Sequence, residues 1–121
     1  MGVIHRYKGD FDWEGVEVGR YPPEKNMKGV SVRYLIGPQE KSPHFAFRYF
    51  EVEPGGYTSL DQHAHDHGVV VQRGQGRVRL GDEEYDITCG DAVYVPGDEV
   101  HQFHNTGDEP FGFFCVIPAL S

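Results

Sequence analysis

The sequence predicts one domain built from β-strands, an all-β fold, and three observations point to this class. Phenylalanine (8) and tyrosine (7) are plentiful while methionine (2) is scarce, and aromatic residues favour strands. The 16 glycines and 8 prolines indicate many turns between short elements. Short apolar runs recur between turn signals, and no segment carries a ten-residue helical period. A length of 121 residues suits one core, so we expect a sandwich or a barrel.

The first 28 residues differ from the rest of the chain. Residues 1–28 are polar apart from a few large side chains such as Trp13 and Tyr21. We expect them to form an extended arm that wraps the core. The barrel is therefore assigned to residues 29–121.

The barrel segment divides into short apolar runs separated by glycine- and proline-rich turns. The predicted strands are Val30–Ile36, His44–Val52, Val69–Gln72, Arg77–Leu80, Glu84–Ile87, Ala92–Val95, Val100–His104 and Phe111–Ile117. The second of them is apolar on both faces, as is typical of a strand buried in a two-layer barrel. The following Pro54-Gly55-Gly56 is expected to end it.

Charge and cysteine content exclude several classes of partner. Nineteen acidic against eleven basic side chains give a formal charge of -8, which repels phosphate backbones and anionic membranes. The N-terminal residues carry no apolar core of signal-peptide length, and no stretch could span a bilayer, so we expect a cytoplasmic protein. We interpret Cys89 and Cys115 as thiols, since nothing indicates secretion.

Three histidines follow the Pro-Gly-Gly break with a strict period of two. An extended chain would place His63, His65 and His67 on one face. Three neutral imidazoles there suit one divalent transition metal, namely Fe, Mn, Ni, Cu or Zn. A solvated polar loop is the alternative, but three histidines in register at a barrel mouth favour the metal.

A fourth histidine lies in a second motif. Residues 90–105 read GDAVYVPGDEVHQFHN, in which a tight turn at Pro96-Gly97-Asp98 leads into His101. This segment resembles the second motif of the cupin superfamily, G(X)5PXG(X)2H(X)3N, from Gly90 to Asn105. Its one departure is Asp98 where a glycine is usual.

The first cupin motif, G(X)5HXH(X)3,4E(X)6G, is matched with two changes. His63 and His65 correspond to HXH, and the spacing back from Gly74 falls on His67, where the family has glutamate. The interval before that position is at least two residues shorter than usual. The resemblance, which covers roughly residues 44–118, thus implies a four-histidine site. If His67 does not reach the metal, a three-histidine face with open positions remains.

The resemblance implies a cupin jelly-roll β-barrel (double-stranded β-helix) with one metal at its centre. Without the glutamate, an all-imidazole site would keep the full +2 charge of the metal. We therefore expect a stronger pull on anionic ligands and a more acidic bound water.

Five further residues are candidates for substrate binding or catalysis. Arg48 could clamp an anionic group if its strand face is inward, or extend outward as strand-edge arginines do. Tyr57 and Gln72 are expected near the barrel mouth, and Phe103 shares a face with His101. Cys115 is either a reactive thiol beside the metal or a small buried hydrophobe.

The resemblance leaves three functions open. We favour an oxidoreductase, of the dioxygenase type, acting on a small molecule. The alternatives are a redox-neutral isomerase or lyase for a sugar, sugar phosphate or small acid, and a binding module without catalysis. Cupin relatives also imply a homodimer in which N-terminal segments exchange strands.

Overall fold

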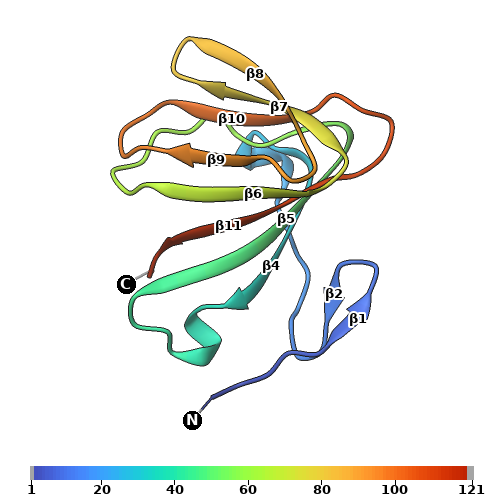
Figure 1. Cartoon of the computed structure of the whole chain (residues 1–121), viewed down its shortest axis with the longest axis vertical. Coiled ribbons are helices and arrows are strands. Elements are labelled where there is room, and N and C mark those ends of the chain that lie inside the picture. The colour runs from blue at the N-terminus through green and yellow to red at the C-terminus, as the bar shows by residue number, and fades with distance from the viewer. Residues whose placement is uncertain (1, 120–121) are drawn as a thin grey trace.

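The computed structural model describes residues 2–119, so the first residue of the predicted arm and the last two of the predicted barrel lie outside the described part. Within this range the chain is almost entirely β-structure (Figure 1). The N-terminal elements are β1 (Tyr7–Gly9), β2 (Asp12–Trp13), β3 (Gly19–Arg20) and the short 3-10 helix η1 (Pro23–Lys25). The following elements are β4 (Lys28–Ile36), the 3-10 helix η2 (Pro38–Glu40), β5 (Phe45–Tyr57), β6 (His67–Arg73), β7 (Gln75–Leu80), β8 (Glu83–Thr88), β9 (Ala92–Val95), β10 (His101–Asn105) and β11 (Phe111–Pro118). No helix among the described residues is long and apolar enough to cross a bilayer.

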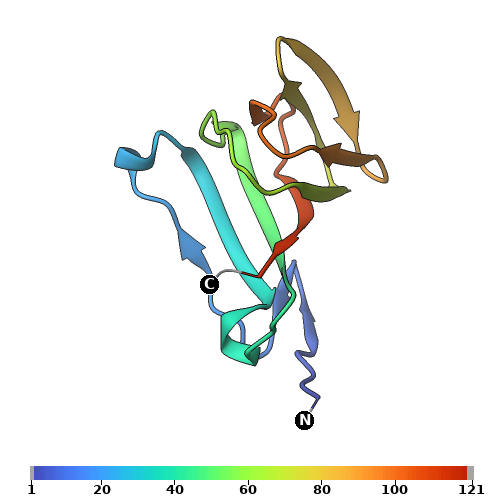
Figure 2. The same cartoon turned by 90° about the vertical axis from the view of Figure 1, so that its left-hand side faces the viewer.

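One sheet forms the body of the molecule. Its strand order is β8-β7-β10-β5-β11-β6-β9, with β4 joining β5 and β3 joining β4. All pairings are antiparallel, and the sheet curls into an incomplete barrel whose two walls face each other (Figures 1 and 2). The predicted all-β jelly-roll class is therefore confirmed.

The core fills the space between these walls. Side chains of a strand point in turn to opposite faces, so every second residue in the paired parts of β5, β6 and β11 enters this space, while the N-terminal arm also buries Tyr49 on the other face of β5. Val52 and Val71 are fully enclosed, and Phe113 packs against Phe50 and Phe103 with ring centroids 5.5 Å and 4.6 Å apart. This apolar layer forms the floor of the pocket described below.

The prediction that β5 ends at Pro54 is wrong, since the strand continues to Tyr57. Its pairing with β4 shifts register between Lys28 and Val30, which absorbs the Pro54-Gly55-Gly56 segment as an irregularity inside the strand. A Cβ at Gly56 would collide with the carbonyl oxygen of Lys28, so glycine permits this close pairing. The bulged extension carries the chain to the barrel mouth.

The N-terminal arm packs against the barrel at two places. In the hairpin of β1 and β2, the Phe11 ring stacks on Tyr49 at 5.0 Å, and Trp13 lies 5.7 Å from the same ring. Tyr49 is fully buried in consequence. Farther along the arm, Tyr21 stacks on Phe50 at the pocket end of the barrel.

A histidine–glutamate pair ties the start of the arm to η2. His5 Nε2 lies 2.8 Å from Glu40 Oε2, and its Nδ1 lies 2.9 Å from the carbonyl oxygen of Glu14. The hydrogen bond with Glu40 and that with Glu14 raise the pKa of His5. Burial alone would raise the pKa of Glu40, but its bonds with His5 and with the Gly37 backbone N–H outweigh this and lower it.

We expect the arm to loosen on both sides of a mildly acidic window. Because the pKa of His5 is raised in the folded state, protonated His5 stabilises the folded arm fully at pH values below its ordinary pKa of 6.5. This stabilisation is lost as the pH rises through the folded-state pKa. Because the pKa of Glu40 is lowered, its carboxylate stabilises the arm at pH values above its ordinary pKa of 4.5. That stabilisation is lost as the pH falls through the folded-state pKa of Glu40. Hydrogen exchange at the Glu14 amide, corrected for intrinsic rates, should therefore be slowest between about pH 4.5 and 6.5, the interval between the ordinary pKa values of the two groups. His5→Gln should remove that minimum, and an unchanged pH profile in this variant would contradict the expectation.

Candidate metal centre

The segment that carries the three clustered histidines is not extended throughout. Residues 64 and 65 form a bend, and β6 begins only at His67. The prediction that one continuous strand face presents all three imidazoles is therefore wrong. Two hydrogen bonds to the Asp98 turn hold the loop in place instead. The Asp98 N–H donates to the carbonyl of His63, and the side-chain Nε2 of Gln62 donates to the carbonyl of Asp98.

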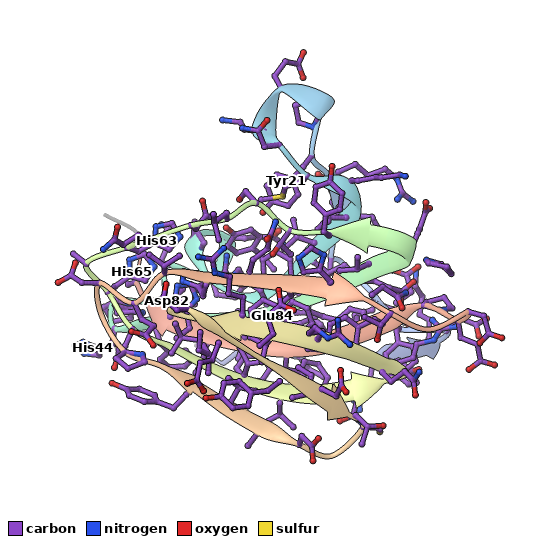
Figure 3. The ribbon with its side chains drawn as sticks, turned by 90° about the horizontal axis from the view of Figure 1, so that it is seen from above. Tyr21, His44, His63, His65, Asp82 and Glu84 are labelled. Atoms are coloured by element: carbon purple, nitrogen blue, oxygen red, sulfur yellow. The ribbon has the colours of Figure 1, made fainter. Side chains whose placement is uncertain are left out.

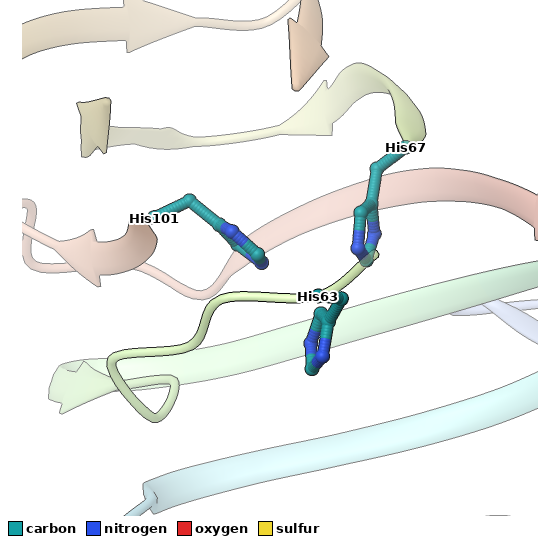
Figure 4. A group of neighbouring side chains, drawn as sticks. All are labelled: His63, His67 and His101. Carbon is teal, nitrogen blue, oxygen red and sulfur yellow. The ribbon is translucent and has the colours of Figure 1, made fainter. Parts of the chain in front are cut away.

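Three imidazoles nevertheless meet at the barrel mouth. One ring nitrogen from each of His63, His67 and His101 lies within 4.8 Å of the others (Figure 4). The ring centroids are 5.5 Å apart for His63 and His67, 5.3 Å for His63 and His101, and 4.9 Å for His67 and His101. Two distant stretches of chain thus supply one cluster.

His65 lies beside this cluster and outside it. Its ring stacks on that of His63 at 4.9 Å with an interplanar angle of 4° and lies 4.9 Å from the His67 ring. Figure 3 shows the His63 and His65 side chains together at one end of the barrel. The bend turns His65 away from the pocket that His63, His67 and His101 line.

The donor atoms of the cluster suit a divalent transition metal. The Nδ1 of His101 contacts the carbonyl of Glu99 at 2.9 Å, which leaves its Nε2 as the lone-pair nitrogen. His67 Nδ1 lies 3.4 Å from Cys115 Sγ, while its Nε2 is buried without a hydrogen-bond partner among the described residues. Burial, followed by the neighbouring imidazoles and Arg48, lowers the pKa of His67 to about 4. Neutral imidazoles with free nitrogens are the form that metals bind, so these residues fit the cofactor that the sequence predicts.

The imidazoles line a pocket of about 190 Å³. Its walls are mostly apolar and comprise Tyr21, Met27, Phe50, Phe103 and Phe113. The polar groups facing it, besides the imidazoles, come from Arg48, Thr58, Asp61 and Cys115. Such a concave apolar site with a few polar groups is typical of small-molecule binding.

Arg48 is a buried cation without a carboxylate partner. It is 9% exposed and forms no ion pair with any residue from 2 to 119. Its guanidinium lies 4.7 Å from the centroid of Phe50 and donates through Nη2 to Cys115 Sγ at 3.3 Å, while Nε has no hydrogen-bond partner in the described part of the chain. The inward orientation of Arg48 therefore places an uncompensated positive charge at the pocket wall.

Cys115 faces the same pocket and is 2% exposed. Burial raises the pKa of its thiol, and Arg48 acts in the opposite direction. The thiol thus lies between a guanidinium and a metal-suited imidazole, and it is also part of the buried core.

Two predicted substrate residues lie elsewhere. Gln72 is exposed on the outer face of β6, because Val71 takes the inward position beside it. Tyr57 is not among the lining residues of the metal pocket; it lies in a neighbouring outer pocket, with its ring 5.8 Å from His104. Conversely, Asp61, two positions before His63, lines the metal pocket although no motif in the sequence marked it as a site residue.

Comparisons with known proteins agree with this architecture. Residues 48–117 match the family described as Cupin domain. The chain is 33% identical over 113 residues to the 1-methylthio-D-xylulose 5-phosphate methylsulfurylase of Rhodospirillum rubrum, covering 93% of this chain and 72% of that protein.

Solved structures extend the similarity to three dimensions. A cupin 2 conserved barrel domain protein from Rhodopseudomonas palustris superposes with a TM-score of 0.86 at 32% identity, covering 98% of this chain and 81% of the other. A sugar phosphate isomerase of the cupin superfamily from Silicibacter pomeroyi gives 0.74 at 25% identity, covering 88% and 73%. The chain therefore belongs to the cupin superfamily and carries its cupin 2 conserved barrel domain.

Proposed function

We propose that this cupin is a metal-dependent enzyme that acts on a small hydroxycarbonyl compound, with a phosphorylated ketose as the substrate class. The observation that carries the proposal is the meeting of three metal-suited imidazoles, a buried guanidinium and a buried thiol in one pocket. The names of two relatives, a methylsulfurylase for 1-methylthio-D-xylulose 5-phosphate and a sugar phosphate isomerase, support this substrate class.

His63, His67 and His101 would hold the metal, which supplies Lewis-acid polarisation of a carbonyl oxygen. Arg48 lines the same pocket, where its charge would stabilise negative charge that develops on the substrate oxygens. The aromatic walls exclude water, so this charge interaction is stronger than it would be in solvent.

A redox-neutral reaction fits the pocket better than dioxygen chemistry. Cys115 Sγ lies 3.4 Å from the Nδ1 of His67, so oxidants generated at the metal would reach this thiol from inside the pocket, although burial and the raised pKa protect it from oxidants in solvent. A buried thiol at that distance is compatible with isomerisation or with cleavage of a carbon–sulfur bond.

A dioxygenase-type oxidoreductase is the second candidate. The observation that favours it is the group of three imidazoles itself, since a three-histidine face leaves open positions for a second ligand beside the substrate. Its pocket requirements otherwise overlap with those of the first candidate.

Proton exchange and oxygen uptake separate the two candidates. Zinc-loaded protein, kept anaerobic in D2O with D-xylulose 5-phosphate and D-ribulose 5-phosphate, should exchange protons beside the carbonyl, as detected by NMR. Metal-free protein should not. Oxygen consumption by iron- or manganese-loaded protein, without anaerobic exchange under any metal, would overturn the proposal and favour the oxidoreductase.

The metal pocket adjoins a more polar outer pocket that suits the distal end of such a substrate. The two pockets share Tyr21, Met27 and Asp61, and the outer one is also lined by Lys25 of the arm. Lys25 is exposed and forms no ion pair with the residues that the structure describes. A phosphate group keeps part of its hydration there, which costs less than burying it beside the aromatic walls.

We expect Lys25→Gln to weaken binding of D-xylulose 5-phosphate about two- to fivefold, the size of one exposed charge interaction. Binding of unphosphorylated D-xylulose should not change. Lys28→Gln removes the same charge from a lysine that does not line the pocket and serves as the matched control. Calorimetric titration of the zinc-loaded parent and of the two variants measures the affinity for each sugar. Equal losses of affinity for D-xylulose 5-phosphate in both variants would contradict a local contact with Lys25.

A further inference from the structure

We infer that Asp61, and not His65, supplies the fourth protein ligand of the metal. This assignment rests on the metal-binding part of the proposed function and concerns which side chain completes the three-histidine group.

The first support is position. Asp61 lines the metal pocket together with His63, His67 and His101, and His65 does not. The carboxylate Oδ2 of Asp61 lies 3.8 Å from Nε2 of His63. The carboxylate is outside the group whose nitrogens lie within 4.8 Å of one another, so a rotation of the Asp61 side chain must accompany ligation.

The backbone holds Asp61 at the cluster. Its N–H donates to the carbonyl of His101 at 3.0 Å, and its carbonyl accepts from the His101 N–H at 2.9 Å. This two-bond bridge fixes the two residues opposite each other on adjacent chain segments. Among the described residues, no backbone hydrogen bond ties His65 to His101, and its ring stacks on that of His63 instead.

The carboxylate has one oxygen available. Ser59 Oγ donates to Oδ2 at 2.6 Å, and Oδ1 accepts no hydrogen bond from residues 2–119. This arrangement matches a ligating carboxylate, in which one oxygen binds the metal and the other is held by a neighbouring donor.

The charge balance provides the second support. A site of three neutral imidazoles leaves both positive charges of the metal uncompensated, close to the buried guanidinium of Arg48. One carboxylate offsets one unit. The family motif provides that unit as a glutamate at the position that His67 occupies here, so Asp61 restores the composition of three histidines and one carboxylate from a different place in the chain.

Metal titration of four variants tests the assignment. Zinc affinity is measured by competition with a chelator at one fixed pH, and the absorption bands of bound Co²⁺ report its coordination. Asp61→Ala is expected to lower zinc affinity by more than roughly 100-fold, as the loss of a ligand should, and to alter the cobalt bands. Asp61→Asn should give a smaller loss, since the amide oxygen is a weaker, uncharged ligand. His65→Ala should leave affinity within about twofold of the parent and keep the cobalt spectrum.

Ser59→Ala is the matched control, because it removes only the hydrogen bond that holds Oδ2. It keeps the carboxylate but no longer holds it in place, so it should lose about tenfold in affinity, less than Asp61→Ala. Parent-like affinity and cobalt bands in Asp61→Ala, with a loss in His65→Ala, would overturn the inference. Parent protein that takes up no metal would overturn both this assignment and the proposed function. Zinc uptake that depends on Asp61, without turnover of any ketose phosphate, would overturn the proposed function alone.

Discussion

Replacing His101 with alanine should abolish stoichiometric metal binding, and replacing His67 should do the same. Each removes one of three imidazoles that the fold brings within 4.8 Å of one another. Substitutions of residues that merely orient a ligand cost about 10–100-fold in affinity, so the loss of a ligand should exceed roughly 100-fold. Elemental analysis after purification without added metal, together with zinc titration, measures the effect.

His104→Ala is the matched control for His101→Ala. The two histidines lie on β10, but His104 faces the other side, where its Nε2 lies 3.1 Å from Gln102 Oε1. This variant should bind one metal per chain. Full metal occupancy in His101→Ala, with folding confirmed by circular dichroism, would refute the candidate centre.

His101 was predictable because the turn that positions it is local. Pro96 and Gly97 reverse the chain within a few residues, and the returning strand starts directly at His101. Turn chemistry and strand alternation then also put Phe103 on the pocket side and His104 outside. Short-range rules were sufficient for this half of the site.

The other half depends on contacts that the sequence does not display. Alternation predicts one face for His63, His65 and His67, but the chain bends at residues 64 and 65 because the loop is anchored to the Asp98 turn. The same tertiary anchoring brings Asp61 to the pocket. Asp61 lies two positions before His63, so extending the period of two backward would have included it. However, no feature of the neighbouring sequence distinguishes an aspartate that binds a metal from one that is exposed to solvent.

Arg48 and Gln72 show how far alternation reaches. Arg48 follows the buried alternation of β5 with Ala46 and Phe50, so its inward direction follows from the strand pattern. Gln72 alternates with Val71 on β6 and accordingly lies outside, even though its sequence position is near the histidines.

The homodimer implied by the family stays a prediction, which sedimentation equilibrium of the full chain would test.

Arg48→Met should separate stability from function. The guanidinium is buried without an ion pair in the described chain, and such a charge lacks the compensation that normally offsets its desolvation. An apolar side chain of similar length packs against Phe50 without that cost. We therefore expect the free energy of unfolding to rise by about 1 kcal/mol or more, equivalent to a melting temperature about 4 °C higher.

The same substitution removes the positive charge that the pocket offers to substrate oxygens. A charge-assisted hydrogen bond in a dry pocket contributes roughly 2 kcal/mol, so affinity of the zinc-loaded protein for D-xylulose 5-phosphate should fall about 30-fold. Arg33→Met is the control for ligand binding, because Arg33 pairs with Asp12 at 3.7 Å and lies over Tyr49, away from the pocket. It should leave that affinity unchanged. If Arg48→Met lowers the melting temperature and binds the ligand as before, the guanidinium is a structural group held by Cys115 and the aromatic rings. A stabilised protein with weakened binding would instead identify a charge kept in the core at the expense of stability because the ligand needs it.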